Sequence, residues 1–434
     1  MDKRKQMIDS LFIGLALFAT YFGAGNLIFP PILGLQSGNN FILGIIGLVI
    51  SGIFIPVAAI VVIGIHGSAN KITEHISKNC YNLCIMAVMF IVLFVGNPRT
   101  AATAIELGVQ GVFPSAPYAP FVVIYFILVF FIAKDKGKVL DKVGKYITPI
   151  LFAILLILII LGIVRPIGTP VSTELKNPLI NSLLQGYQTG DILVSFLMAS
   201  VFLANIESKG YLGNDKKKIM TMASIVAFIG LFIVYGGLFY MGACGSGIFP
   251  ADIGRAELLV AINRKVGGQV AMNALGISVI LACFTTAVGQ ATAGADFFVT
   301  LSKGKFNYKI TMACLCILSG LMALIGVDRI VMFANPIYSA VYPVLVVIVL
   351  LGVFSKIIPN DGAYKGAIIL TLIYSVCEAL NTALHIDIIG GFVNVMPFAS
   401  NGFGWVIPCI VGFIVGLAIY PLMKSQKLIK KKEC

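Results

Sequence analysis

Charged side chains are scarce in this sequence: only 11% of its 434 residues are Asp, Glu, Lys or Arg. A soluble domain carries about 25% charged residues, because its surface must stay hydrated. Hydrophobic residues make up 59% of the chain, and the mean hydropathy is +1.00. These proportions exclude an ordinary soluble protein and indicate an integral membrane protein.

The sequence also lacks the motifs of several enzyme classes. It contains no phosphate-binding loop ending in Gly-Lys-Ser/Thr, no His-Glu-x-x-His and no Gly-x-Ser-x-Gly. Only three histidines are present, and the nine cysteines show no metal-ligand spacing and fall mostly in apolar segments. We therefore expect no catalytic residues, no enzymatic activity and no ATPase partner.

Long apolar runs are what the chain has instead. Each is close to the ~20 residues that cross a hydrocarbon core. The runs are continuously apolar and do not alternate with polar residues, so they predict helices rather than a β-barrel. The fold class is therefore an all-α integral membrane protein with about twelve transmembrane helices, predicted at 8–36, 40–65, 80–108, 118–134, 144–164, 187–208, 217–245, 270–300, 308–327, 330–354, 363–383 and 401–423.

The basic residues are distributed unevenly between the connections of these helices. Of the 31 Lys and Arg, 24 fall in one set of alternate connections and six in the other, while Arg99 lies inside a span. Cytoplasmic loops carry such an excess, so both termini are predicted to be cytoplasmic in a multi-pass plasma-membrane protein. The net charge of +13 is thus explained by the lipid bilayer as partner, and nucleic acid is not expected.

The first predicted helix contains residues that interrupt helices. Gly23-Ala24-Gly25-Asn26 stands at its middle, and Pro30-Pro31 follows. Non-helical backbone at membrane depth is tolerated where it lines a cavity or binds a ligand. We therefore predict a binding site at Phe22, Gly23, Ala24, Gly25 and Asn26. The alternative is that the two glycines only allow close helix packing.

This segment closely resembles the first helix of the branched-chain amino acid:cation symporter family, the bacterial carriers of leucine, isoleucine and valine. The matching residues are Gly23 to Pro31, which read GAGNLIFPP, and Leu33-Gly34-Leu35-Gln36. Three further segments resemble the same family, and the similarity extends to the C-terminus. They are Pro98-Arg99-Thr100, Gly186-Tyr187-Gln188-Thr189-Gly190-Asp191 and Thr285-Thr286-Ala287-Val288-Gly289.

The resemblance implies a leucine-transporter-type fold. In that fold helices 1–5 and 6–10 form two inverted repeats, here 8–164 and 187–354, and two additional helices follow at 363–423. Helices 1 and 6 are expected to unwind near the membrane midplane. Helix 6 has no Gly or Pro at its centre, so the position of its break is not fixed. From that region Ser195, Met198 and Ala199 are predicted to contact the substrate.

The predicted site suits an amino acid. Its carboxylate would meet the free N–H groups that begin the second half of helix 1, and its ammonium the carbonyls that end the first half. The substrate side chain would enter an apolar pocket from helices 3, 6 and 8. Such pockets separate substrates that differ by one methylene only weakly, so leucine, isoleucine and valine are expected to share the carrier.

Helix 8 offers candidate ligands for a co-transported sodium ion. The carbonyl of Ala282 and the hydroxyls of Thr285 and Thr286 lie on one helix face, and hard oxygen ligands suit sodium rather than soft metals. The resemblance adds the carbonyls of Ala19 and Phe22 to this site. The alternative is that both threonines bond back to their own helix.

Proton coupling and other functions remain rivals. A proton-coupled carrier needs a titratable group near the ion site, and no Lys lies within 146–164 and no His or carboxylate near the middle of helix 1 or helix 8. This favours sodium. A secondary carrier of another small amino acid is the closest rival, ahead of a channel or an intramembrane enzyme.

Charges inside the predicted spans are functional candidates. Arg99 lies in the outer part of helix 3 and Asp191 in the outer part of helix 6. We hypothesise that they pair and close or orient the extracellular side of the site. Glu106, seven residues after Arg99 on the same face, competes for this role.

Overall fold

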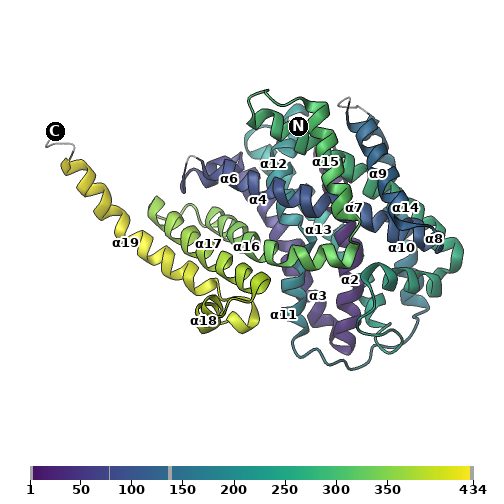
Figure 1. Ribbon diagram of the computed structural model, residues 1–434. Helices are drawn as coiled ribbons and strands as arrows, with labels where there is room; N and C mark the ends of the chain where they lie inside the picture. The colour runs from purple at the N-terminus through teal and green to yellow at the C-terminus, as the bar shows by residue number, and fades with distance from the viewer. Residues whose placement is uncertain (1–2, 78, 135–138, 431–434) are drawn as a thin grey trace.

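The computed structural model describes residues 3–77, 79–134 and 139–430, and the regular structure in these ranges is helical throughout (Figure 1). The first half contains the helices α1 Lys3–Tyr21, α2 Ala24–Ser37, α3 Phe41–Val49, α4 Ile55–His66, α5 Ala69–Thr73, α6 Cys80–Ile91, α7 Asn97–Thr103, α8 Gln110–Val112, α9 Tyr118–Ala133, α10 Val139–Val164 and α11 Pro178–Gln185. Short 3₁₀ or π segments join several of them: η1 Gly38–Asn40, η2 Ile50–Phe54, η3 Val92–Gly96, η4 Ala104–Val109 and η5 Gly186–Thr189.

The second half contains longer helices. They are α12 Asp191–Ser208, α13 Gly213–Ala243, α14 Arg255–Leu301, α15 Tyr308–Ala323, α16 Val327–Val353, α17 Asp361–Leu384, α18 Asp387–Val395, η6 Ala399–Asn401 and α19 Val406–Lys430. Helical segments thus lie across each of the twelve predicted ranges. Lys78, Lys136, Lys138, Lys431 and Lys432, on which part of the charge asymmetry rests, lie outside the described residues.

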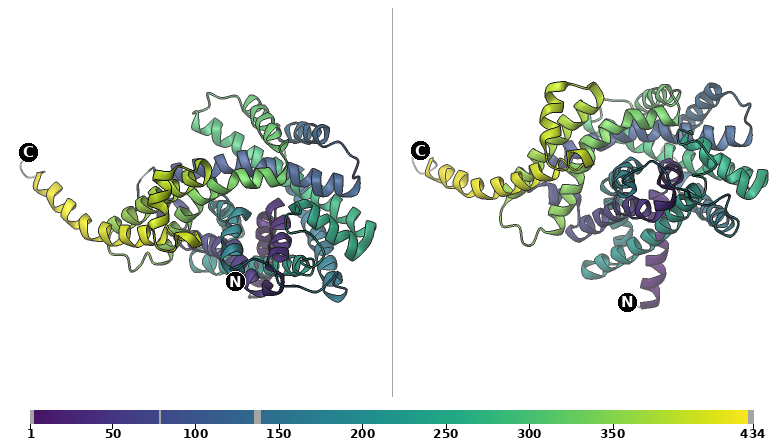
Figure 2. Two further views of the ribbon diagram at one scale, coloured as in Figure 1. Left: turned by 60° about the horizontal axis from the view of Figure 1, so that its bottom comes forward. Right: turned by 90° about the horizontal axis from the view of Figure 1, so that it is seen from below.

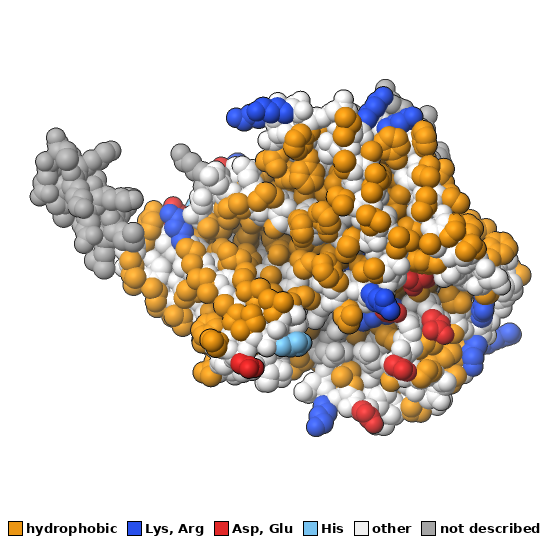
Figure 3. Space-filling view, in the orientation of Figure 1, with side chains coloured by type: hydrophobic (Ala, Val, Ile, Leu, Met, Phe, Trp, Pro, Cys, Tyr) orange, Lys and Arg blue, Asp and Glu red, His pale blue; other side chains and the backbone are white. Residues whose placement is uncertain are grey.

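The surface of the bundle suits a bilayer. Among the described residues, seven helical segments are long and apolar enough to cross a membrane, and four shorter apolar helices accompany them. Hydrophobic side chains cover most of the upper and middle part of the face shown in Figure 3, whereas charged side chains lie along its top and in its lower part, many of them at the lower right. The molecule is therefore a multi-pass membrane protein.

Two predicted spans differ from the structure. Helix 6 was expected at 187–208, but it begins nine residues earlier with α11, inside the segment expected to be an outer loop. Helix 8 was expected at 270–300. In the structure α14 begins at Arg255 and continues across a kink at Gly268, whose φ of 64° lies in the left-handed region.

Glycines set the closest helix contacts. A Cβ on Gly34 of α2 would collide with the Phe239 carbonyl of α13, and one on Gly242 of α13 with the Pro31 carbonyl of α2. Small residues allow such backbone approach in membranes. The same device joins α17 to α19, which lie together at one side of the bundle (Figures 1 and 2). Close packing of α2 on α13 fixes the wall behind the helix 1 break.

Candidate functional site

Helix 1 is broken where the sequence predicted. α1 ends at Tyr21, α2 begins at Ala24, and Gly23 between them is extended (φ −121°, ψ −167°). Within the described ranges no side chain caps the start of α2, although the Gly23 amide donates to Asn26 Oδ1 over 3.4 Å. The first N–H groups of a helix and its last carbonyls lack helical partners. The break therefore presents amides from α2 and carbonyls from α1 in a buried position.

Helix 6 breaks before Ser195, Met198 and Ala199, the residues that were predicted to contact the substrate. A 3₁₀ turn, η5, leads to Gly190, whose φ of 78° favours glycine, and α12 starts at the next residue. A Cβ at Gly190 would also lie 2.9 Å from the Tyr338 hydroxyl. The break thus falls at Gly186–Gly190, within the motif that resembled the family, and not within 192–208.

Asn26 and Asp191 bring the two breaks together. Asn26 Nδ2 donates to both carboxyl oxygens of Asp191, over 3.2 and 2.9 Å, and contacts the Tyr235 hydroxyl. The Tyr235 hydroxyl in turn donates to Asp191 Oδ2 over 2.9 Å. Asn26 and Asp191 are each 1% exposed. A hydrogen-bonded triad from helices 1, 6 and 7 therefore fixes the start of α12 against the start of α2.

Arg99 holds the end of the first half of helix 6. Its guanidinium donates to the carbonyls of Gln188 over 2.5 Å and Thr189 over 3.3 Å. It also lies against Gly25, where a Cβ would be 3.0 Å from Nη2. The segments η3 and η4 on either side of α7 are π-helical, a form often found at functional sites. Arg99 thereby satisfies carbonyls that the break leaves without helical partners.

The hypothesised charge pair takes a different form. No ion pair joins Arg99 to Asp191 or to Glu106 in the part of the chain that the structure describes. Glu106 instead accepts the Val327 amide at the start of α16 over 2.8 Å. Arg99 and Asp191 both act at the helix 6 break. Arg99 donates to two of its carbonyls, and Asp191 accepts hydrogen bonds from Asn26. Both therefore belong to the site without touching as a pair.

The helix 6 residues predicted to contact substrate lie inside α12. The Ser195 hydroxyl is 2.8 Å from the Tyr21 hydroxyl and 2.8 Å from the Pro56 carbonyl. Ser195 and Ala199 are fully buried, and Met198 packs against the core. Ser195 thus joins α12 to the end of α1 and to α4, and its polar atoms are already engaged.

The helix 8 threonines bond back to their own helix, which was the stated alternative to a sodium site. The hydroxyls of Thr285 and Thr286 each donate to the Ala282 carbonyl over 2.9 Å. This brings together three of the five predicted sodium ligands. The other two, Ala19 and Phe22, lie at the end of α1, whose main neighbours are α12 and α13 rather than α14.

A cavity of about 1300 Å³ opens toward this site from the predicted extracellular side. Gln188 of η5 lines it, beside an ion pair of 2.5 Å between Arg255 and Asp328. The guanidinium groups of Arg99 and Arg255 both lie against the Phe29 ring, 5.8 and 5.7 Å from its centroid. Phe29 thus contacts one cation that holds the helix 6 break and one that lines the cavity.

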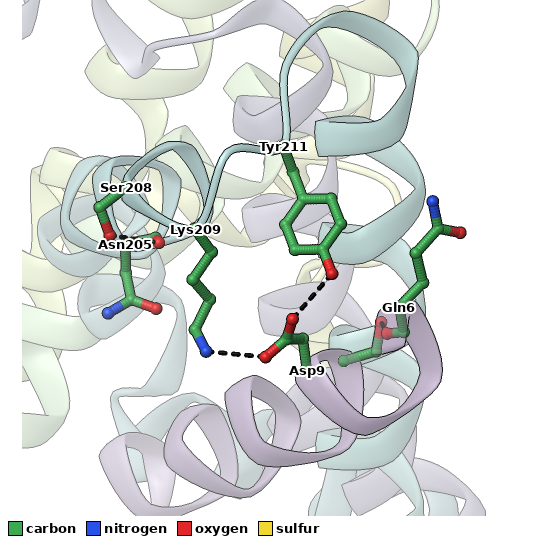
Figure 4. Close-up of polar contacts among 7 residues, drawn as sticks. Gln6, Asp9, Asn205, Ser208, Lys209 and Tyr211 are labelled. Atoms are coloured by element: carbon green, nitrogen blue, oxygen red, sulfur yellow. Dashed lines mark hydrogen bonds and ion pairs between the residues drawn. The ribbon is translucent and has the colours of Figure 1, made fainter. Parts of the chain in front are cut away.

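The predicted cytoplasmic end carries a second polar cluster, drawn in Figure 4. Lys209 and Tyr211, in the turn after α12, both point toward Asp9 on α1, at 2.8 and 2.7 Å. The Tyr211 side chain is fully buried. These contacts tie the first half of helix 1 to the second half of helix 6.

Sequence reasoning missed Tyr235, Arg255 and Asp328. Tyr235 is one aromatic residue in an apolar helix, and no local pattern distinguishes it from a packing residue. Arg255 and Asp328 lie at the starts of α14 and α16, 73 residues apart. The charges were visible, but their pairing depends on tertiary structure.

Comparison with known proteins decides the family. A family model described as "Branched-chain amino acid transport protein" matches residues 6–423. The chain belongs to this family. Among relatives of this transport protein, branched-chain amino acid permease BraB of Bacillus subtilis is 31% identical, over 98% of each chain. The branched-chain amino acid transport system 2 carrier protein of Pseudomonas aeruginosa is 28% identical, over 96% of this chain and 98% of the relative.

Solved structures confirm the fold of this transport protein. Inward-facing Mhp1 is similar with a TM-score of 0.59 and 13% identity, over 96% of this chain and 91% of Mhp1. MhsT in complex with L-phenylalanine is similar with a TM-score of 0.57 and 16% identity, over 94% of this chain and 97% of MhsT. The predicted leucine-transporter-type fold is thus confirmed. The division into repeats at 8–164 and 187–354 stays a prediction.

Proposed function

We propose that this protein takes up leucine, isoleucine and valine across the bacterial plasma membrane by symport with sodium, with both termini in the cytoplasm. The observation that supports this most is the meeting of two broken helices, held together by Asn26 and Asp191. The names of the relatives, which are permeases and carriers of branched-chain amino acids, support the substrate class.

The substrate backbone would bind at the helix 1 break. Its carboxylate meets the uncapped amides at Ala24 and Gly25, where the positive end of the α2 dipole adds attraction. Its ammonium meets the last carbonyls of α1. Gly23, Ala24 and Gly25 carry no bulky side chains of their own that would keep a ligand from this backbone. The desolvated charges of the zwitterion are thereby paired.

Sodium would bind at the carbonyls of Ala19, Phe22 and Ala282 and the hydroxyls of Thr285 and Thr286. Donation of each hydroxyl proton to the Ala282 carbonyl is compatible with this role, because a hydroxyl keeps acceptor lone pairs for a cation. The site requires α1 and α14 to approach. An ion that moves down the membrane potential gains about 2.3 kcal/mol per charge per 100 mV, which drives uphill uptake.

Proton coupling is the second candidate, and one observation favours it. The sequence placed no carboxylate near the middle of helix 1, but the structure brings Asp191 from helix 6 to Asn26 there. A buried carboxyl group between two broken helices is a candidate proton carrier. Substitution of Asp191 therefore tests proton coupling, and substitution of Thr285 tests sodium coupling.

Uptake into proteoliposomes tests the proposal. Radiolabelled leucine is offered with an inward sodium gradient at equal pH, or with an inward proton gradient without sodium. We expect accumulation with sodium alone, competition by isoleucine and valine, and loss of sodium dependence in Thr285→Ala. Accumulation with the proton gradient alone, abolished by Asp191→Asn, would replace sodium by protons. No leucine uptake under either gradient would overturn the proposal.

A further inference from the structure

Two hollows beside α15 lie outside the proposed transport route. One, of about 440 Å³, lies between the end of helix 3, the first part of α14 and the α15–α16 turn. The other, of about 410 Å³, runs between α9 and α15. Leu324 lines both. They therefore adjoin at this residue, as a polar mouth beside an apolar groove.

The groove has the dimensions of a single membrane leaflet. On α9 its lining extends from Val122 to Phe131, about 14 Å at the helical rise of 1.5 Å per residue. One leaflet is about half of the ~30 Å hydrocarbon core. Gly320 on α15 leaves the Phe126 ring room, since a Cβ there would lie 3.3 Å from it. The groove thus has the length and the lining for an acyl chain.

The helices beside the groove are fastened at both ends. The Tyr118 hydroxyl donates to the Ala323 carbonyl over 2.7 Å at the outer end, and the Tyr308 hydroxyl to the Ala133 carbonyl over 3.1 Å at the inner end. These contacts attach α9 to α15 at both ends of the groove. The groove is accordingly a feature of the packing and not a gap between loose helices.

The mouth carries charges of both signs. Glu106, Glu257 and Arg264 line it, with Gln110 and Tyr118. Glu106 uses Oε1 for the Val327 amide, and Arg264 uses one N–H for the Gly111 carbonyl over 2.7 Å. A guanidinium has five N–H donors and a carboxylate two oxygens, so both groups keep capacity for a ligand. A ligand with an anionic and a cationic group fits this mouth better than a simple ion.

We propose that this site binds an outer-leaflet phospholipid whose headgroup carries a primary ammonium group, of the phosphatidylethanolamine class. The phosphate lies on Arg264, the ammonium lies on Glu106 and Glu257, and one acyl chain follows the groove past Leu324. Arginine binds phosphate through its planar fork. This inference is independent of which cation drives transport.

The inner end of the groove offers a competing occupant. Lys134 Nζ lies 4.5 Å from the centroid of the Phe131 ring, which lines the deep end. An anionic lipid of the inner leaflet would use this lysine and would ignore Arg264. The two lipids are thus distinguished by headgroup and by the variant that releases them.

Native mass spectrometry of the purified full-length protein tests the site. The probes are dioctanoyl phosphatidylethanolamine and dioctanoyl phosphatidylglycerol at equal concentrations. We expect the first to be retained about fivefold better, and Arg264→Gln to weaken its binding about fivefold, the range of an exposed ion pair. Lys265→Gln, which removes the same charge from a neighbour outside the mouth, is the matched control and should change nothing.

A second pair of variants tests the groove. Ala313→Phe places a ring in it, whereas Cys314→Phe adds the same ring on an exposed face of α15 that does not line it. Retention should fall in the first variant only. Equal retention of both lipids, or unchanged retention in Arg264→Gln and Ala313→Phe, would overturn the proposal. So would release by Lys134→Gln alone, or displacement of the lipid by free leucine.

Discussion

The Asn26–Asp191 contact should couple the two broken helices in energy as well as in geometry. Asn26→Ala removes the Nδ2 group that donates to Asp191 over 2.9 Å and contacts Tyr235. A hydrogen bond to a carboxylate contributes about 1.5–3 kcal/mol, and a neutral one about 1 kcal/mol. The expected loss is therefore about 3 kcal/mol in the arrangement that binds substrate.

Leucine affinity reports this loss. The apparent dissociation constant rises as the binding-competent fraction falls, so about 3 kcal/mol corresponds to roughly a hundredfold weaker binding in a scintillation proximity assay. Asn263→Ala is the matched control. That residue is also a buried asparagine, but its amide donates to the Leu259 carbonyl of its own helix and not across helices among the described residues. Its replacement should change the dissociation constant less than threefold.

A double-mutant cycle with Asp191→Ala isolates the contact itself. Residues that interact should show a coupling energy of about 1.5–3 kcal/mol, so that the double variant binds leucine scarcely worse than the worse single variant. Effects that add within about 0.5 kcal/mol would refute the reasoning. The breaks would then be held by other contacts.

Three further predictions concern the site and its support. Arg99→Lys should reduce leucine uptake at least tenfold, because one ammonium group cannot hold two carbonyls as the guanidinium fork does. Exchanging Arg99 and Asp191 should not restore uptake. Partial rescue by the exchange would show that the two residues pair directly. Gly34→Ala should lower the apparent Tm by several degrees, because the added Cβ would collide with the Phe239 carbonyl. Gly236→Ala is the control and should not lower the Tm, because its Cβ would have no described atom of a neighbouring segment within 4 Å. Equal Tm values for the two variants would contradict the described α2–α13 packing. Thr285→Ala should raise the sodium concentration for half-maximal uptake about tenfold or more without changing leucine competition by valine, and an unchanged sodium response would remove Thr285 from the ion site.

The fold was predictable because membrane helices can be recognised from the hydropathy of the sequence alone. Each apolar run is close to the length that spans the bilayer, and the alternation of Lys and Arg counts supports the predicted number of crossings. The exception is helix 6. Its first half, α11, is short and contains Asn181, Ser182 and Gln185, so its hydropathy resembles that of a loop. Burial against α3 and α2, which is a tertiary property, makes it part of the bundle.

The site was predictable only where local sequence alone determines the backbone. Gly23 and Gly25 marked the helix 1 break, and Gly190 could have marked the second, because its left-handed φ requires glycine. The partners of Asp191 could not be found in this way. Asn26 and Tyr235 are 165 and 44 residues away in the sequence, and only the packed bundle brings them to one carboxyl group.

The two threonines show a further limit. The spacing correctly placed Ala282, Thr285 and Thr286 on one face, but it could not distinguish hydroxyls that face an ion from hydroxyls that bond to their own helix. Both arrangements use the same i, i+3 and i+4 geometry.

The central claim is that leucine binds where the breaks of helices 1 and 6 meet. An experimental structure of the protein with leucine and sodium tests it most directly. The account predicts the leucine carboxylate on the amides of Ala24 and Gly25, its ammonium on the last carbonyls of α1, and Asp191 still bonded to Asn26. Leucine bound away from both breaks, with Gly23 and Gly190 contacting neither ligand nor ion, would contradict the account.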